Sequence, residues 1–200
     1  MKKVIAICGR KRSGKDTAAD FISKTYGHCH VKIADPLKKV CGILFGYTQD
    51  QMENDRKEIA CEPFGISPRQ AMQFFGTEVM QYKIQELLPA MKARTFWINA
   101  LVNQYKNKDT SIVISDVRFP HEITAIYEAY GRDNVTVVKV MGVEVGISGA
   151  GAGADADADA DAGASHCSEQ EWTGINEDLL VNNTGTKDDL YMQLHLHSTR

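Results

Sequence analysis

Short apolar runs alternate with helical patterns along most of the chain. Apolar residues that recur every three or four positions predict helices over 17–26, 37–44, from 67 onward, 120–131 and 186–196. Continuous apolar or β-branched runs predict buried strands at 4–8, 30–33, 111–115, 135–140 and 179–181. Alternating strands and helices predict an α/β fold in which a parallel sheet has helices on both faces.

The segment 36–105 is almost wholly helical in pattern, and it separates two of the predicted strands. Within it, Ser67-Pro-Arg-Gln70 predicts a helix start, with Ser67 as N-cap and Gln70 completing a capping box. We interpret this segment as a helical insertion that binds a substrate. At 200 residues and 43% hydrophobic content, the chain suits a single domain. The domain then has a core of 1–35, 106–145 and 170–200, a helical region at 36–105 and a loop at 146–166.

Residues 149–164 are only glycine, alanine and aspartate, with strict Ala-Asp alternation at the centre. Without larger apolar side chains, such a segment cannot offset its ordering entropy, so we expect a mobile loop. The spacing lacks the glycine and final glutamate of an EF-hand, which disfavours a calcium site. The regularity suggests an engineered loop, and the sequence leaves natural origin open.

Charge and cysteine content exclude several classes. The net charge is −3, and the aspartates of the alternating loop account for it, so we expect no nucleic-acid polymer as partner. The five cysteines form no CxxC pair, which argues against a disulfide framework or a zinc site. No apolar run is long enough to span a membrane, and we expect a cytoplasmic protein. A homodimer is a weak expectation from size alone.

The segment Gly9-Arg-Lys-Arg-Ser-Gly-Lys-Asp-Thr17 follows the first predicted strand and precedes a helix. This context favours a phosphate-binding loop over a simple basic turn. Gly9 and Gly14 allow backbone N–H groups to face a phosphate, with Lys15 reaching the β- and γ-phosphates. The loop also includes Lys11, Arg12 and Ser13. Asp16 replaces the usual magnesium-binding hydroxyl. Either Asp16 approaches the metal, directly or through water, or Thr17 takes part.

Further candidates follow a strand or begin a helix. Asp116 lies just past the strand predicted at 111–115, where it suits a magnesium-bound water or an acceptor, and Arg118 suits a phosphate. A surface turn with a local ion pair is the alternative. Arg69 lies in a first helical turn, where the dipole disfavours a cation, so it favours an anionic partner over simple solvation. Gln73, one turn later, suits a base edge or a helix surface. Trp97 is more typical of a core than of a base-stacking site.

Several motifs together resemble the phage-type deoxynucleoside monophosphate kinases. They are the phosphate loop with its Lys15-Asp16 pair, Ala34-Asp-Pro-Leu-Lys38, Arg69 with Gln73-Phe-Phe-Gly-Thr77, Trp97, Ser115-Asp-Val-Arg-Phe-Pro-His-Glu122, Ser165-His-Cys-Ser-Glu169 and Asn182-Asn-Thr-Gly185. The likeness covers nearly the whole chain in the same order.

The resemblance implies a P-loop kinase fold, with the helical insertion binding substrate and a mobile lid. It implies transfer of the γ-phosphoryl group of ATP to a deoxynucleoside 5′-monophosphate, with Mg²⁺ required. Lys15 and the loop would bind ATP phosphates, Arg69 and Arg118 the acceptor phosphate, and Asp16 and Asp116 the metal. The other implied positions are Asp35, Lys38, Gln73, Trp97, Asp116 and Glu122 around the acceptor, Asn183, Thr184 and Gly185 at adenine, and His166, Ser168 and Glu169 at the return from the lid.

One feature departs from that family. Residues 141–164 contain no Lys or Arg, whereas kinases of this kind usually carry arginines in the lid. Arg10, Lys11 and Arg12 compensate in part, and we expect weaker catalysis than in relatives with a basic lid.

Two other functions fit the same loop. A small-metabolite kinase of the phosphomevalonate kinase type shares Gly-Lys-Asp but needs no base-reading residues, and Gln73 with Trp97 favours a nucleotide. A nucleotide-binding protein with an impaired lid would bind without turnover. The base and the choice between deoxyribose and ribose stay open.

Overall fold

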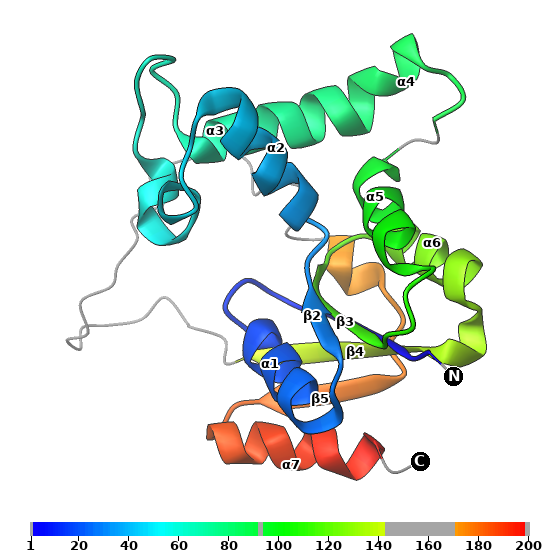
Figure 1. Cartoon of the computed structure of the whole chain (residues 1–200). Coiled ribbons are helices and arrows are strands. Elements are labelled where there is room, and N and C mark those ends of the chain that lie inside the picture. Colours follow the sequence, from blue (N-terminus) through cyan, green and yellow to red (C-terminus); the bar gives the residue numbers. More distant parts are fainter. Residues whose placement is uncertain (1, 92–93, 143–170, 199–200) are drawn as a thin grey trace, which may run out of the picture.

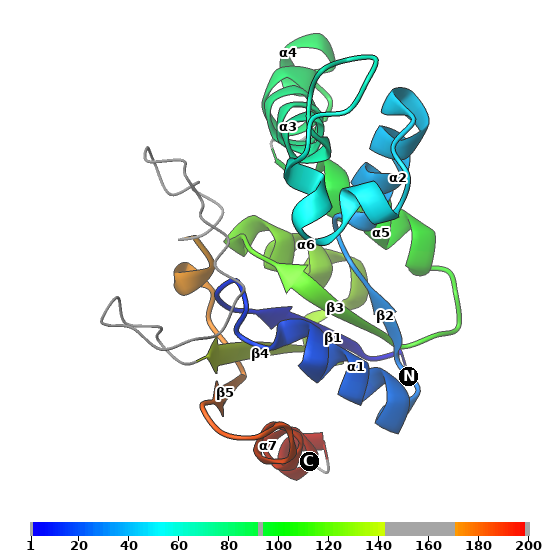
Figure 2. The same cartoon turned by 90° about the vertical axis from the view of Figure 1, so that its left-hand side faces the viewer.

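In the described residues, five parallel strands form one sheet in the order β2-β3-β1-β4-β5 (Figure 1; β1 is labelled in Figure 2). The computed structural model describes residues 2–91, 94–142 and 171–198. The strands are β1 (Val4–Cys8), β2 (Cys29–Val31), β3 (Ile112–Val117), β4 (Val135–Gly142) and β5 (Leu179–Asn183). This confirms the predicted parallel α/β sheet.

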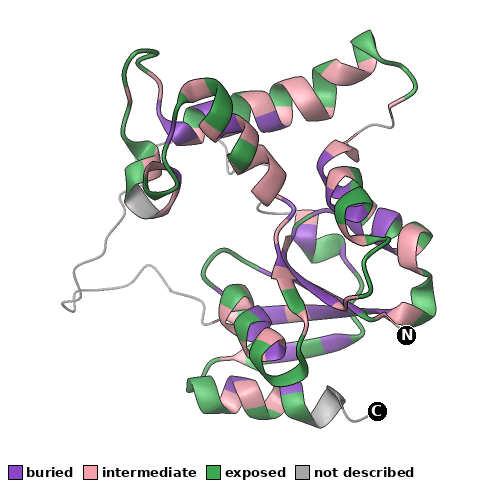
Figure 3. Cartoon of the chain, viewed as in Figure 1, coloured by how far each residue is buried: buried purple, intermediate pink, exposed green. Residues whose placement is uncertain are grey.

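Helices cover both faces of the sheet (Figure 2). On one face, α1 (Lys15–Tyr26) and α7 (Lys187–Ser198) pack over Ile7, Val113 and Val138. On the other face, α5 (Phe96–Tyr105) and α6 (Pro120–Tyr130) pack over alternate strand residues such as Ala6 and Ile114. Successive strand side chains point to opposite faces, so the buried central strands supply both cores (Figure 3).

A helical arm, residues 35–88, stands away from the sheet (Figures 1 and 2). Its elements are α2 (Asp35–Phe45), the 3₁₀ turns η1 (Asp50–Met52) and η2 (Asn54–Glu58), α3 (Pro68–Gln73), the π-helical η3 (Phe74–Lys83) and α4 (Ile84–Leu87). The arm has a small core of its own around Cys41, Tyr47, Met52 and Ala71. By contrast, α5 packs on the sheet, although it belongs to the segment from which we expected the insertion.

Several element ends differ from the prediction. β3 continues to Val117, so Asp116 lies within the strand rather than just past it. α1 begins at Lys15 because Gly14, in a left-handed conformation, serves as its N-cap. β2 ends at Val31, and a turn leads from there into α2. The chain also has the 3₁₀ turns η4 (Arg132–Asn134) and η6 (Glu171–Gly174).

The structure describes no helix with the length and apolar character needed to cross a bilayer, within 2–91, 94–142 and 171–198. The expected mobile loop at 149–164 and the expected lid at 146–166 lie outside the described residues.

Candidate active site

The loop from Gly9 to Gly14 is held close to the neighbouring strands. Gly9 has φ 145°, and a Cβ there would lie 2.3 Å from the carbonyl oxygen of Val140 on β4. Gly14 has φ 97°, and its Cβ would lie 2.4 Å from Nδ2 of Asn183 on β5. Both glycines are therefore required by backbone conformation and by close approach.

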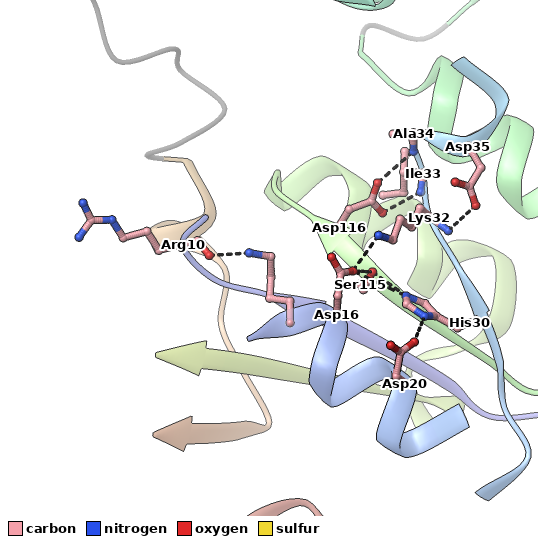
Figure 4. A network of polar contacts seen from close by, with 11 residues as sticks. Arg10, Asp16, Asp20, His30, Lys32, Ile33, Ala34, Asp35, Ser115 and Asp116 are labelled. Atoms are coloured by element: carbon pink, nitrogen blue, oxygen red, sulfur yellow. Dashed lines mark hydrogen bonds and ion pairs between the residues drawn. The ribbon is translucent and has the colours of Figure 1, made fainter. Parts of the chain in front are cut away.

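Hydrogen bonds shape the interior of this loop. Asn183 Nδ2 donates to the Ser13 carbonyl over 3.0 Å, and the Ser13 amide donates to the Arg10 carbonyl over 3.1 Å. Lys15 Nζ donates to that same carbonyl over 2.5 Å (Figure 4). Ser13 Oγ is buried and has no hydrogen-bond partner in the described part of the chain. A concave loop with an orphan hydroxyl and an inward lysine fits the phosphates of a nucleotide.

Burial and Arg118 both lower the pKa of Lys15, with Asp16 and Asp116 acting in the opposite direction. Lys15 is therefore influenced by Asp116 and Arg118, at the end of β3, as well as by its neighbour Asp16. An anion placed against Lys15 and Arg118 would relieve the repulsion between them.

Asp16 is the end of a chain of polar contacts through three elements (Figure 4). Ser115 Oγ on β3 donates to Asp16 Oδ1 over 2.7 Å, and Lys32 Nζ lies 2.9 Å from the same oxygen. His30 on β2 contacts Ser115 Oγ through Nε2 and Asp20 Oδ1 through Nδ1, each at 2.8 Å. Because the Ser115 hydroxyl gives its hydrogen to Asp16, the Nε2–H of His30 is the donor between them.

Asp16 is held as a carboxylate by this network. Partial burial opposes its ionisation, but the hydrogen bonds from Ser115 and Lys32 outweigh burial and lower its pKa. An ionised oxygen ligand beside the phosphate loop suits Mg²⁺, which takes one or two carboxylates together with substrate phosphates. The described residues contain no cluster of three or more His, Cys, Asp or Glu side chains that would hold a metal by themselves. The Asp16 carboxylate therefore fits a metal ion whose other ligands include phosphate oxygens.

Asp116 faces the turn that leads into the helical arm. Its Oδ1 accepts the Ile33 amide over 2.7 Å, and its Oδ2 accepts the Ala34 amide over 3.0 Å (Figure 4). Burial raises the pKa of Asp116, although these two hydrogen bonds oppose the shift. Asp116 thereby ties the end of β3 to the base of the arm.

A cleft of about 650 Å³ separates the phosphate loop and the end of β3 from the helical arm. Within the described part of the chain, its charged lining comprises nine cationic side chains, Lys11, Arg12, Lys15, Lys32, Lys38, Lys57, Arg69, Arg94 and Arg118, and four acidic ones, Asp16, Glu53, Asp116 and Glu122. This excess of positive charge raises the local concentration of polyanions and stabilises them once bound. The cleft is therefore built for two phosphate-bearing ligands or one large one.

Comparison with known proteins agrees with this geometry. The family model described as deoxynucleotide monophosphate kinase matches residues 3–65. A protein of Acanthamoeba polyphaga mimivirus, named "Putative deoxynucleotide monophosphate kinase", is 34% identical over 137 residues, which are 64% of this chain and 70% of the relative. The chain belongs to the deoxynucleotide monophosphate kinase family.

Solved structures show the fold of this kinase. Shikimate kinase from Aquifex aeolicus vf5 is similar with a TM-score of 0.54 and 12% identity, over 96% of this chain and 94% of that one. A gluconokinase from Sinorhizobium meliloti 1021 is also similar, with a TM-score of 0.46 and 9% identity over 98% and 94% of the two chains. The likeness to the shikimate kinase, together with the parallel sheet, confirms the predicted P-loop kinase fold.

On the side of the cleft formed by the helical arm, α3 carries Arg69 and Gln73 into the lining. The predicted capping box is present, because Ser67 Oγ accepts the Gln70 amide and Gln70 Oε1 accepts the Ser67 amide. Arg69 forms an ion pair with Glu58. The structure thus places the predicted arginine at the cleft on a helix whose start is fixed by its own sequence.

Trp97 is both a core residue and part of the cleft wall. Its side chain is 5% exposed, and Nε1 donates to the Gly76 carbonyl over 2.9 Å. This bond joins α5 to the helical arm. Both interpretations of Trp97, core and acceptor contact, are compatible with this position.

Glu122 is buried at the start of α6. Its Oε2 accepts the Arg118 amide over 2.8 Å and the Phe119 amide over 3.0 Å. Burial raises the pKa of Glu122 to about 7, against the effect of these two hydrogen bonds. Glu122 thus fixes the turn that presents Arg118 to the cleft.

Some predicted site residues lie away from the cleft lining. The Asp35 carboxylate accepts the Lys32 amide over 3.1 Å. Asn183 braces the phosphate loop, while Thr184 and Gly185 are exposed between β5 and α7. Thr17 is half-buried in α1 and is not part of the lining. Glu169, with His166 and Ser168, lies outside the described residues.

Sequence reasoning missed four side chains that belong to this site. Lys32, Lys57, Arg94 and Ser115 line the cleft. Arg94 pairs with Glu171 over 3.2 Å and lies 4.5 Å from the centre of the Phe119 ring. Its partner is 77 positions away, so no local pattern shows the contact. In the sequence, Ser115 stood out only as part of a motif. The structure shows that its hydroxyl contacts Asp16 on α1 and His30 on β2.

Proposed function

We propose that this kinase transfers the γ-phosphoryl group of Mg-ATP to the 5′-phosphate of a deoxynucleoside monophosphate, giving the diphosphate and ADP. The observation that supports this most strongly is the single cleft in which the phosphate loop faces Arg69 and Arg118. The two reactants together carry about four negative charges once Mg²⁺ is bound, and the positive excess of the cleft suits that load.

In the proposed reaction, an oxygen of the acceptor phosphate attacks the γ-phosphorus. The bond from the γ-phosphorus to the β–γ bridging oxygen breaks, and ADP leaves with its electron pair. The attacking phosphate, with a second pKa of about 6, is largely ionised at neutral pH. No general base is therefore needed, and the protein contributes positioning and charge neutralisation.

Each part of the cleft has a proposed task. Lys15 and the loop amides bind the β- and γ-phosphates, and Asp16 holds Mg²⁺ directly or through water. Arg118 and Arg69 hold the acceptor phosphate from opposite walls. When bound, Mg²⁺ neutralises charge on the β- and γ-phosphate oxygens and orients them.

The remaining assignments concern the adenine of ATP, the acceptor nucleotide and the turns where the helical arm begins. Asn183, Thr184 and Gly185 are proposed to lie near adenine, with Asn183 also bracing the loop. Gln73, Trp97 and Lys38 are proposed to contact the acceptor. Asp35, Asp116 and Glu122 then act through the backbone turns that they hold.

The test is ADP production from Mg-ATP with each deoxynucleoside and ribonucleoside monophosphate, beside phosphomevalonate. We expect turnover with at least one deoxynucleotide. Turnover with phosphomevalonate alone would replace this proposal by a metabolite kinase. ATP binding with no turnover on any acceptor would contradict phosphoryl transfer.

A further inference from the structure

Cations from four separate elements meet where the helical arm faces the phosphate loop. Lys57 of η2, Lys38 of α2, Arg69 of α3 and Lys11 of the loop all line the cleft. Lys57 is half-buried, and among the described residues it has neither a hydrogen-bond partner nor an ion-pair partner. A long cationic side chain withdrawn from water in this way is costly without an anion beside it.

The charges around Lys57 are mostly of its own sign. Burial lowers the pKa of Lys57 most, and then Arg69, Lys11 and Lys38 lower it further, while Glu58 acts in the opposite direction. Glu58, however, is already the ion-pair partner of Arg69. The repulsion within this group destabilises the unliganded protein, and bound phosphate would remove it.

The two strongest charges that act on Lys57 come from different walls of the cleft. Arg69 belongs to the acceptor side of the cleft, whereas Lys11 belongs to the phosphate loop. Lys57 therefore lines the same cleft as both of these groups and is close enough to each to feel its charge. The sequence from 143 to 170 holds no Lys or Arg.

We propose that Lys57 is a catalytic residue that contacts the transferring phosphoryl group and supplies, from the helical arm, the positive charge that basic lids supply in other kinases. This inference rests on the proposed phosphoryl transfer. The ammonium group forms no covalent bond. Its flexible stem lets it stay close to the phosphoryl group during transfer and stabilise the negative charge of the transition state.

The test compares Lys57→Gln, Lys57→Arg and a control, Lys39→Gln, in which the lysine is exposed on α2 and lies outside the cleft lining. Lys57→Gln is expected to lower kcat by about 10²-fold, with smaller changes in the two KM values, because the contact strengthens in the transition state. Lys57→Arg should recover most of the rate. Lys39→Gln should behave as wild type.

A second readout separates catalysis from folding. Without ligand, Lys57→Gln should melt at the wild-type temperature or above it, because the substitution removes repulsion. If Lys57 had only a structural role, Lys57→Gln would have a lower Tm than wild type. Inorganic tripolyphosphate should raise the Tm of wild type and of Lys39→Gln more than that of Lys57→Gln.

These measurements keep the two proposals apart. Wild-type kcat in Lys57→Gln would overturn the role of Lys57 while leaving phosphoryl transfer intact. If the wild type turns over no acceptor, the proposed function fails. The tripolyphosphate shift then decides alone, and equal shifts in all variants would overturn the anion contact of Lys57.

Discussion

Asp16 stands where phosphate loops usually carry a hydroxyl, and Ser115 on β3 brings a hydroxyl to the same point. The two side chains are joined by a 2.7 Å hydrogen bond, and His30 holds Ser115 from the other side. The kinase therefore keeps both a carboxylate and a hydroxyl beside its phosphate loop, although they come from elements far apart in the sequence. We expect the hydroxyl to orient Asp16 toward the metal.

Removing that hydroxyl tests the arrangement. Ser115→Ala should raise the Mg²⁺ concentration for half-maximal activity by about 10-fold, as is usual for partners that orient a metal ligand. The matched control is Ser111→Ala, just before the other end of β3, where the hydroxyl accepts the Lys3 amide. Titration of activity and of Mn²⁺ binding with metal measures the effect. Equal half-saturation in the two variants would contradict it.

Glu122 provides a pH-dependent test. Its pKa rises from 4.5 to about 7 on folding, so the folded state binds more protons than the unfolded state between these values. This contribution to stability is complete below pH 4.5 and is lost as the pH rises through about 7.

Glu122→Gln keeps an oxygen that accepts the Arg118 and Phe119 amides but carries no charge to bury. At pH 8 we expect the variant to be more stable than wild type by about 1–3 kcal/mol, with the difference shrinking toward pH 5. Urea unfolding at several pH values measures it. A constant difference across this range would show that Glu122 does not titrate as described.

At the scale of elements, α3 is positioned by its own first residues. The Ser67 and Gln70 capping box fixes the start of the helix, which carries Arg69 in its first turn and Gln73 one turn later into the cleft. Local sequence thus determines where Arg69, the arginine proposed to bind the acceptor phosphate, lies. The phosphate loop is similar, because the conformations of Gly9 and Gly14 were predictable from the motif alone.

Ser67→Ala is expected to destabilise the kinase by about 1 kcal/mol through loss of the cap. It should also raise KM for the deoxynucleotide more than KM for ATP, because Arg69 moves with the helix start. Ser67→Thr retains a capping hydroxyl and serves as the control. Thermal unfolding and steady-state kinetics measure both effects. An equal rise of the two KM values would contradict the claim that the Ser67 cap positions Arg69 for acceptor binding.

Elements defined by long-range packing were harder to predict. β3 extends over Asp116 and Val117 because it pairs with β1, whose register shifts near Cys8. α5 joins the sheet because Trp97 and its neighbours pack on the central strands, while its indole N–H reaches Gly76 in the arm. The helical pattern of 36–105 gave no sign of that division.

At the scale of the molecule, the cleft joins the phosphate loop, the end of β3 and the helical arm. The sequence predicted most of the charged groups there, because a phosphate loop and a strand end are local signals. It could not show the contact of His30 with Ser115 across 85 positions, nor the group formed by Lys57, Lys11 and Arg69. The first depends on the pairing of β2 with β3, and the second on where the arm lies relative to the phosphate loop. The base contacts assigned to Gln73 and to Asn183 stay predictions.

The central claim is that this cleft moves a phosphoryl group from ATP to a deoxynucleotide. The most direct measurement follows the label of γ-³²P-ATP into deoxynucleoside diphosphate, with wild type, Lys15→Ala and the exposed control Lys24→Ala. We predict labelled diphosphate from wild type and Lys24→Ala, and at least about 10²-fold less from Lys15→Ala. Label that appears only as inorganic phosphate, or diphosphate formed equally well by Lys15→Ala, would contradict the account.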